Sequence, residues 1–257
     1  METSRQGASH SGGAARDADP WPGAVLQVLD VTGSTMDDAL ALSRSGCASG
    51  SAVMAGFQEK GRGRVPGRTW VSPPGESMLA TIVIRHGDIP FPINELPLRA
   101  GVAAARAVEE AAGIRVQIKW PNDLVWQGRK LAGILCESRG SAALVGMGVN
   151  CLQTSFPEGL AMPACSILQA GGRAVDPRAL LPVILRHLRH VMNDAGWRAD
   201  LDERLYARGT RIAVDLLGSG QVREGVLQGV DELGRIVLAL DGGELVSVAQ
   251  GEIRTGP

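Results

Sequence analysis

The pattern of the sequence changes after Gly209, and this change constrains the fold more than any other feature of the chain. Apolar runs and helix-length amphipathic segments come before it, whereas residues 211–256 hold only short alternating segments separated by Gly and Asp-Gly turns. Short strands with frequent turns are typical of a small β-barrel, here of about 45 residues. A chain of 257 residues is long enough for one large and one small core. We therefore predict a larger domain over 23–208 and a barrel over 209–257.

The larger domain mixes helices and strands without strict β-α-β alternation. The run MLATIVIR at 78–85 is apolar as a buried strand is, whereas 95–112 has helical apolar spacing and is followed by Gly113. Ser34, with Asp37 three residues on, resembles the capping box that starts a helix. The expected fold class is therefore α+β with a mixed sheet, rather than a doubly wound sheet. The predicted strands are 24–30, 51–57, 78–85, 115–119, 123–126, 130–138 and 142–150, and the predicted helices are 36–45, 95–112, 177–193 and 198–208.

The composition is that of an ordinary soluble globular protein. Apolar residues make up 44% of the chain, charged residues 21%, and the formal net charge is −1, so nothing electrostatic favours a nucleic-acid partner. Residues 1–22 lack the apolar run of a signal peptide, and we predict a disordered tail there. No segment reaches the ~20 apolar residues of a membrane span. The four cysteines have no close-paired spacing, which argues against zinc or a disulfide framework and fits the cytoplasm.

A first candidate site is the loop from Gln58 to Trp70, QEKGRGRVPGRTW, between two predicted strands. It holds three glycines and three arginines. Glycines let the backbone come close to an anion, and arginines offer planar forks for carboxylate or phosphate oxygens. The residue order is not that of a Walker phosphate loop. By itself the run leaves an anion site and a solvated basic loop both open.

A second candidate site is KWPNDLVWQGRKLAGILCE, which begins at Lys119. Pro121 stiffens a bend between strands, where Asn122 and Asp123 can face a pocket. Lys130 begins an apolar strand, so we expect its ammonium near that bend, where it could bridge a carboxylate and a phosphate. It is one of only three lysines in the chain, beside 23 arginines. Spacing alone also fits a hairpin with a solvent-exposed lysine.

Together these segments closely resemble the biotin protein ligase family. The blocks GRGRVPGRTW, KWPND, RKLAGIL and VGMGVN occur in the family's order, and the resemblance covers roughly residues 26–255. It implies a mixed-sheet catalytic domain, related to class II aminoacyl-tRNA synthetases and lipoate ligases, followed by an SH3-like barrel. Little sequence precedes Val25, so the chain resembles the short class without an N-terminal DNA-binding domain.

The activity implied by the resemblance is ATP-dependent activation of biotin to biotinyl-5'-AMP, with Mg²⁺ beside the nucleotide. The biotinyl group then passes to a lysine of a biotin carboxyl carrier protein. Lys130 and Arg62 are implied catalytic residues, Trp70 is expected to form a pocket wall, and Asp123 is our candidate for orienting or deprotonating the carrier lysine. The implied biotin-binding residues are Ser34, Thr35, Gln58, Gly61, Arg62, Gly63, Arg64, Trp70, Lys130 and Gly133, and the implied ATP- or adenylate-binding residues are Arg64, Lys119, Asn122, Lys130 and Asn150.

Two positions depart from the family pattern. Val65 and Pro66 both stand between Arg64 and Gly67, where the family has one residue, so the loop geometry after Arg64 is an open question. Met36 stands where the family usually has asparagine.

A lipoate-type ligase or acyltransferase is the nearest alternative, because it also modifies a carrier lysine; the double Gly-Arg and KWPND favour biotin. A regulator that binds biotinyl-adenylate or DNA without catalysis fits less well with the near-neutral charge. The pair Gly146-x-Gly148 is interpreted as a strand kink beside the adenosine pocket rather than a dinucleotide fingerprint. His187 and His190 have no evident third ligand, so no metal site is expected from side chains. No membrane partner is expected, and the sequence leaves open both the modified carboxylase and the choice between monomer and homodimer.

Overall fold

The computed structural model describes residues 21–254. The disordered tail expected over 1–22 lies outside the described residues except for Trp21 and Pro22. Trp21 is not part of a tail, because its side chain is only 3% exposed and its indole N–H donates to the Leu185 carbonyl at 2.8 Å. Within the described part of the chain, no helix is long and apolar enough to cross a membrane.

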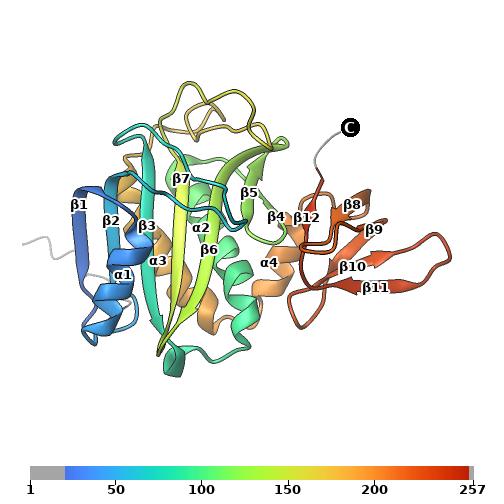
Figure 1. Ribbon diagram of the computed structural model, residues 1–257, viewed down its shortest axis with the longest axis horizontal. Coiled ribbons are helices and arrows are strands. Elements are labelled where there is room, and N and C mark those ends of the chain that lie inside the picture. The colour runs from blue at the N-terminus through green and yellow to red at the C-terminus, as the bar shows by residue number, and fades with distance from the viewer. Residues whose placement is uncertain (1–20, 255–257) are drawn as a thin grey trace, which may run out of the picture.

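A seven-stranded mixed sheet forms the centre of the larger domain (Figure 1). Its order is β1-β2-β3-β7-β6-β5-β4; β1 runs parallel to β2, and every other neighbouring pair is antiparallel. The expected α+β class with a mixed sheet is thus confirmed. Strands β3 and β7 lie inside the sheet and are buried along almost their whole length, which explains their apolar sequences. The strands are β1 (Leu26–Thr32), β2 (Ala52–Gln58), β3 (Ser77–Arg85), β4 (Gln117–Lys119), β5 (Asp123–Trp126), β6 (Arg129–Arg139) and β7 (Ala142–Asn150).

Helices cover both faces of this sheet (Figure 1). Helix α1 (Thr35–Arg44) packs on β2, β3 and β7 around a small apolar cluster. Helices α2 (Leu96–Ala112) and α3 (Pro177–Asn193) pack against each other over the other face, where the main hydrophobic core lies. Helix α4 (Trp197–Arg204) contacts α2 and β4. One face therefore carries two long helices, whereas α1 covers only part of the other.

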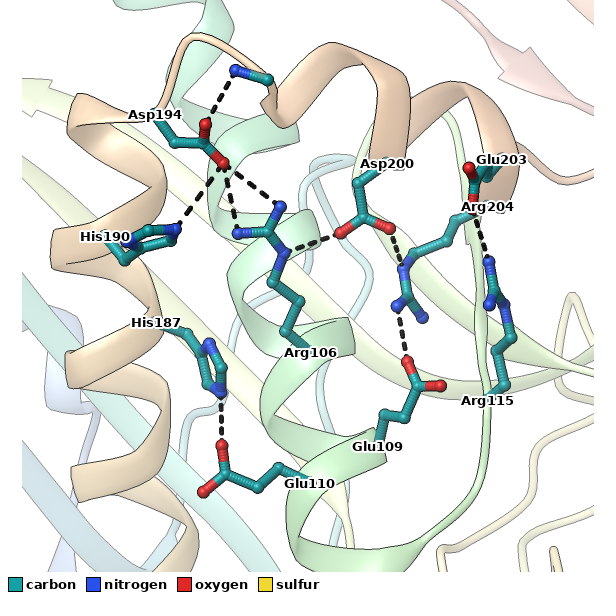
Figure 2. A network of polar contacts seen from close by, with 11 residues as sticks. Arg106, Glu109, Glu110, Arg115, His187, His190, Asp194, Asp200, Glu203 and Arg204 are labelled. Atoms are coloured by element: carbon teal, nitrogen blue, oxygen red, sulfur yellow. Dashed lines mark hydrogen bonds and ion pairs between the residues drawn. The ribbon is translucent and has the colours of Figure 1, made fainter.

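Arginine–carboxylate pairs join α2 and α4 and the turn between α3 and α4 (Figure 2). Arg106 donates to Asp194 and, at 2.7 Å, to Asp200. Arg204 donates to Asp200 and to Glu109. Burial alone would raise the pKa of Asp200, but the hydrogen bonds from Arg106 and Arg204 outweigh it and hold that pKa below its ordinary value. These pairs, which we call the helix network (Arg106, Glu109, Asp194, Asp200 and Arg204), fix the helices to one another.

The C-terminal residues form a second, antiparallel sheet of five strands, consistent with the expected SH3-like barrel. Its order is β11-β10-β9-β8-β12, and its small core holds Val214, Leu227, Ile236 and Leu238. The strands are β8 (Arg211–Asp215), β9 (Val222–Val230), β10 (Ile236–Ala239), β11 (Leu245–Val248) and β12 (Glu252–Ile253).

The turn between β9 and β10 fixes the barrel to the larger domain. Arg198 donates to the carbonyls of Asp231 and Glu232, both at 3.0 Å, and the indole N–H of Trp120 donates to the Gly234 carbonyl at 3.0 Å. These hydrogen bonds to backbone carbonyls join the two units, whose buried apolar residues also belong to one continuous cluster.

The structure corrects one predicted helix and bears out another. Helix α4 ends at Arg204 rather than at 208, because Leu205 leaves the helix to pair with Ile118 on β4. Helix α3 begins at Pro177 as predicted, and the Asp176 side chain caps it by accepting a hydrogen bond from the Arg178 N–H.

Candidate active site

A cavity lies on the α1 face of the sheet, beside the first turn of that helix. Its empty space, counted together with the open solvent at its mouth, is about 500 Å³. The β2–β3 loop forms one side, and strands β3, β6 and β7 form the floor. The lining residues are Ser34, Thr35, Met36, Gln58, Arg62, Gly63, Arg64, Trp70, Thr81, Asn122, Lys130, Gly133, Ile134, Leu135, Gly146, Met147 and Gly148.

The β2–β3 loop folds back on itself as a short hairpin. The Trp70 N–H donates to the Gly61 carbonyl at 3.1 Å, and the Gly63 N–H donates to the Arg68 carbonyl at 2.9 Å. Gly61 has no room for a side chain, since a Cβ there would lie 2.5 Å from the Trp70 carbonyl oxygen. Glycine at this position therefore lets the two arms of the loop pair closely.

The extra residue of the loop is taken up at its tip. The Arg68 N–H donates to the Val65 carbonyl, with Pro66 second in the turn and Gly67 third at φ +84°. Proline followed by a residue of positive φ is the pattern of a type II turn. The paired arms are undisturbed, and Arg64 still lines the cavity.

The start of α1 faces this cavity. Ser34 occupies the N-cap position, but its side chain makes no capping hydrogen bond, and its Oγ is buried without a partner among residues 21–254. Asp37 accepts hydrogen bonds from Arg62 instead, the shorter at 2.8 Å. The predicted capping box is therefore wrong, and the Ser34 hydroxyl is left available to a ligand.

Arg64 joins the loop to the rest of the site and to the barrel. Its Nε donates to Asn122 Oδ1 at 3.2 Å, while its Nη2 donates to the Gly251 carbonyl and to Glu252. Arg68 donates to the same Glu252 carboxylate at 2.8 Å. Burial lowers the pKa of Arg64, and the negative charge of Glu252 offsets part of that lowering. The arginine nevertheless stays protonated at neutral pH. Two arginines of the loop are thus held by one carboxylate of the barrel.

Lys130 forms an ion pair beside the loop. Its Nζ lies 2.8 Å from Asp123 Oδ1. The two atoms form an ion pair, but their geometry does not meet the angles of a hydrogen bond. Gly133 lies opposite Asp123 across β5 and β6, and a Cβ there would lie 3.3 Å from Lys130 Nζ and 3.0 Å from the Trp70 ring. The backbone N–H of Lys130 donates to the Pro163 carbonyl at 2.7 Å. The hydrogen bond to Pro163 therefore fixes the backbone of Lys130, and the absence of a side chain at Gly133 leaves room for the lysine to reach Asp123 on β5.

Hydrogen bonds at the inner end of the cavity connect three elements. The N–H and the hydroxyl of Thr35 both donate to Gln58 Oε1, at 2.8 and 2.9 Å. Thr81 Oγ1 on β3 lies 2.9 Å from Thr35 Oγ1. Because the Gln58 carbonyl is turned to Thr35, its amide nitrogen is left as a donor, and none of the described residues accepts from it.

Glycines on β7 make the floor of the cavity. A Cβ on Gly148 would lie 2.5 Å from the Trp70 ring, and a Cβ on Gly146 would lie 2.8 Å from the Met36 sulfur. The Trp70 indole therefore lies directly on the strand, and its Nε1 is buried without a partner in the described chain. The Gly146-x-Gly148 pair, interpreted from the sequence as a kink beside an adenosine pocket, instead makes room for Met36 and Trp70.

Four residues expected in the site do not line the cavity: Gly61, Lys119, Asp123 and Asn150. Gly61 accepts a hydrogen bond from the N–H of the lining residue Trp70, and Asp123 pairs with the lining residue Lys130. Lys119 is 8% exposed, and burial lowers its pKa. Asn150 is buried, donates to the Cys165 carbonyl at 3.1 Å and accepts from Gln153.

Sequence reasoning missed several residues of the site. Thr81 lies within an apolar run that was read only as a buried strand, yet a hydroxyl in such a run is itself a signal. Glu252 carries no local signal, since its partners Arg64 and Arg68 are far away in sequence.

The described residues form no metal-binding cage. No group of three or more His, Cys, Asp or Glu side chains in residues 21–254 is placed to hold a metal ion. The Asp123 carboxylate is paired with Lys130, a residue that lines the cavity. A magnesium ion bound with ATP does not need such a cage, because it keeps several waters and is held mainly through the phosphates.

Comparisons with known proteins agree on one family. A profile of the Biotin/lipoate A/B protein ligase family matches residues 28–154. The chain is 33% identical over 240 residues to a biotin--[acetyl-CoA-carboxylase] ligase of Mycobacterium tuberculosis, covering 89% of this chain and 88% of that protein. It is 34% identical over 232 residues to the enzyme of the same name from Paracoccus denitrificans, covering 82% and 92%. Its structure matches a biotin protein ligase from Aquifex aeolicus in complex with biotin and ATP, with a TM-score of 0.78, 25% identity, and coverage of 90% and 99%.

Proposed function

This chain belongs to the biotin/lipoate A/B protein ligase family, and from that premise we propose that it is a biotin protein ligase. It activates biotin with ATP to biotinyl-5'-AMP and transfers the biotinyl group to a carrier lysine. One observation carries the proposal: a single cavity holds Arg62, Arg64 and Lys130 beside unpartnered hydrogen-bonding groups deeper in.

The inner end of the cavity suits the cyclic urea of biotin. Ser34 Oγ and the Gln58 amide nitrogen are both free to donate, and a urea carbonyl oxygen accepts two such bonds. Leaving these groups unpaired costs stability unless a ligand pairs them. The Trp70 ring, lying on Gly148, provides an apolar wall for the rest of the bicycle.

Activation takes place at the outer, cationic end. The biotin carboxylate attacks the α-phosphorus of ATP, a C–O–P bond forms, and pyrophosphate leaves. Charge builds up on the phosphoryl oxygens during this step, and Arg62, Arg64 and Lys130 are placed to offset it. Arg62 can release Asp37 to do so, because that pair is exposed to solvent and contributes little stability.

Transfer needs an amine in its neutral form. The carrier lysine must lose a proton, attack the acyl carbon and release AMP, and we assign Asp123 to orient or deprotonate it. The Lys130–Asp123 ion pair supports this assignment, because the carboxylate lies beside the lysine that we assign to the phosphate, so that one pair of strands would serve both half-reactions.

The nucleotide is assigned to the outer end of the site, near Asn122, Lys119 and Asn150. Asn122 lines the cavity, whereas Lys119 and Asn150 are buried and do not line it in this structure. Magnesium enters the proposal as the counterion of the ATP triphosphate, and the side chains of residues 21–254 form no cage of three or more ligands for it.

The comparisons favour biotin over the lipoate-type alternative, because the relatives that cover most of the chain are named biotin ligases. The carrier is proposed to be a biotin carboxyl carrier domain, after the acetyl-CoA-carboxylase in those names. The cytoplasm is proposed as its location, since all four cysteines are free. The choice between monomer and homodimer is the remaining question about partners, and light scattering in solution, with and without biotin and ATP, would decide it.

The test is a single reaction. The purified protein is incubated with ATP, Mg²⁺, biotin and a carrier domain, and the mass of the carrier is measured. A gain of one biotinyl group on one lysine is expected. Lipoate replaces biotin in a parallel reaction; modification by lipoate alone, or by neither acid, would overturn the proposal.

A further inference from the structure

Thr81 is a buried hydroxyl in the middle of a strand where an apolar side chain would be usual. It is 0% exposed, and its neighbours in β3 from Met78 to Ile84 are all apolar. It lies on the α1 face of the sheet, where it lines the inner end of the cavity. Burying a hydroxyl is costly unless it is hydrogen-bonded, so its partner matters.

The direction of the hydrogen bonds around Thr81 follows from counting protons. Gln58 Oε1 can only accept, so the Thr35 hydroxyl, at 2.9 Å, must donate to it. That hydroxyl has a single proton, which is then committed. In the 2.9 Å contact between the two threonine oxygens, Thr81 is therefore the donor.

The result is a chain in one direction, from Thr81 through Thr35 to the carbonyl of Gln58. Hydrogen bonds in such a chain polarise and strengthen one another. The Thr35 N–H, also bonded to Gln58 Oε1, holds the amide from the same side. The Gln58 amide is thereby fixed with its nitrogen, not its oxygen, available to the ligand.

We propose that Thr81 is a positioning residue, which acts through Thr35 to hold Gln58 as a donor to the urea carbonyl of biotin. The inference rests on the proposed function, and it adds the residue that fixes the polarity of the inner end. With Thr81 in place, that end presents donors to a carbonyl oxygen. Without it, the orientation of the Thr35 hydroxyl is no longer fixed. One of the two hydrogen bonds that hold the Gln58 carbonyl is then weakened.

The first test is Thr81→Val, which keeps the shape and removes the donor. The KM for biotin should rise about five- to tenfold with kcat unchanged, the effect of about one net hydrogen bond. Thr81→Ser, which keeps the hydroxyl, should restore KM to within about twofold of the parent. Thr210→Val is the matched control: it removes an exposed threonine hydroxyl at the start of the barrel, and its KM should not change.

A second measurement separates positioning from packing. The parent enzyme should prefer biotin to its thiourea analogue, because a C=S group accepts hydrogen bonds more weakly than C=O. Thr81→Val should reduce that preference. If both KM values rise equally, Thr81 only fills space, and the inference is wrong.

The outcomes also separate this inference from the proposed function. A parent enzyme that does not biotinylate the carrier refutes the function, whereas an active parent with an unchanged Thr81→Val refutes only the role of Thr81. Should the valine variant fail to fold, Thr81→Cys gives the same test, since a thiol is similar in size and a much weaker donor.

Discussion

The helix network and the cavity differ in whether their polar side chains have partners within the protein. In the helix network, Arg106 and Arg204 both donate to Asp200, and each meets a further carboxylate. In the cavity, buried groups such as Ser34 Oγ and Trp70 Nε1 have no partner in the described chain. Both regions are polar and poorly exposed, but every charged group of the helix network is paired within the protein, whereas these cavity groups are not.

This difference separates structure from function. Paired charges tie helices together and contribute to the free energy of folding, whereas unpaired buried groups cost stability until a ligand meets them. Arg204 Nη1, in the helix network, also lacks a partner, so an unpaired atom is informative only where it faces a cavity. Substitutions in the two regions should therefore change different measurements.

The largest effect is expected from Lys130→Ala in the cavity. Removing this cation should slow adenylate formation about 1000-fold, because it offsets charge on the phosphoryl oxygens. Pyrophosphate release in single-turnover reactions measures that step. Lys60→Ala, which removes an exposed lysine of the same loop region, is the control and should retain full rate. A Lys130→Ala enzyme within about tenfold of the parent would contradict the assignment.

Asp123→Asn should separate the two half-reactions. Transfer to the carrier lysine should slow about 100-fold, the usual scale of general-base catalysis, while adenylate formation slows much less. Preformed biotinyl-5'-AMP mixed with enzyme and carrier isolates the transfer step. Equal loss in both half-reactions would count against a role for Asp123 in deprotonation.

Asp200→Asn should leave catalysis intact and lower the free energy of unfolding by about 2 kcal/mol, because the buried Arg204 and the half-buried Arg106 lose their shared carboxylate. The pKa of Asp200 is depressed in the folded protein, so its contribution is present above its unfolded value, near 3.8, and is lost as pH falls through the folded pKa. Urea unfolding between pH 7 and pH 3 should show a steeper loss for the parent than for the variant. Parallel curves would mean that Asp200 adds no pH-dependent stability.

The smallest effect is expected where barrel and loop meet. Glu252→Gln should weaken the hold on Arg64 and Arg68, so trypsin should cleave the loop about two- to threefold faster. Glu244→Gln, an exposed change elsewhere in the barrel, is the control. Unchanged cleavage would show that the loop is held without this carboxylate.

The sequence predicts a structural feature correctly where the two groups that form it are neighbours in the chain. Helix α3 begins at Pro177 as predicted, and the Asp176 carboxylate that caps it accepts from an N–H only two residues away. Ser34 has the same kind of local signal, but its side chain faces the cavity and caps nothing. A capping residue in the sequence does not show whether its side chain will turn to the helix or to a cavity. The Arg-Gly loop and the Lys130 strand were recognised by motif and do share one cavity.

What could not be predicted depends on contacts between distant residues. The end of α4 is set by pairing of Leu205 with Ile118, which is stronger than the helical pattern that continues beyond Arg204. The orientation of Gln58 depends on Thr35 and Thr81, which belong to two other elements. No periodicity in the sequence contains such information.

The contact between Arg64 and Glu252 has a consequence for how the protein is made. The two residues are 188 positions apart, so the ribosome must synthesise nearly all of the described chain before Glu252 exists to hold the loop. A nascent chain stalled before the barrel would already carry every residue of the cavity but leave its arginines untethered. The loop arginines therefore gain their carboxylate partner only when the last domain has been synthesised, so the charged side of the cavity is completed last.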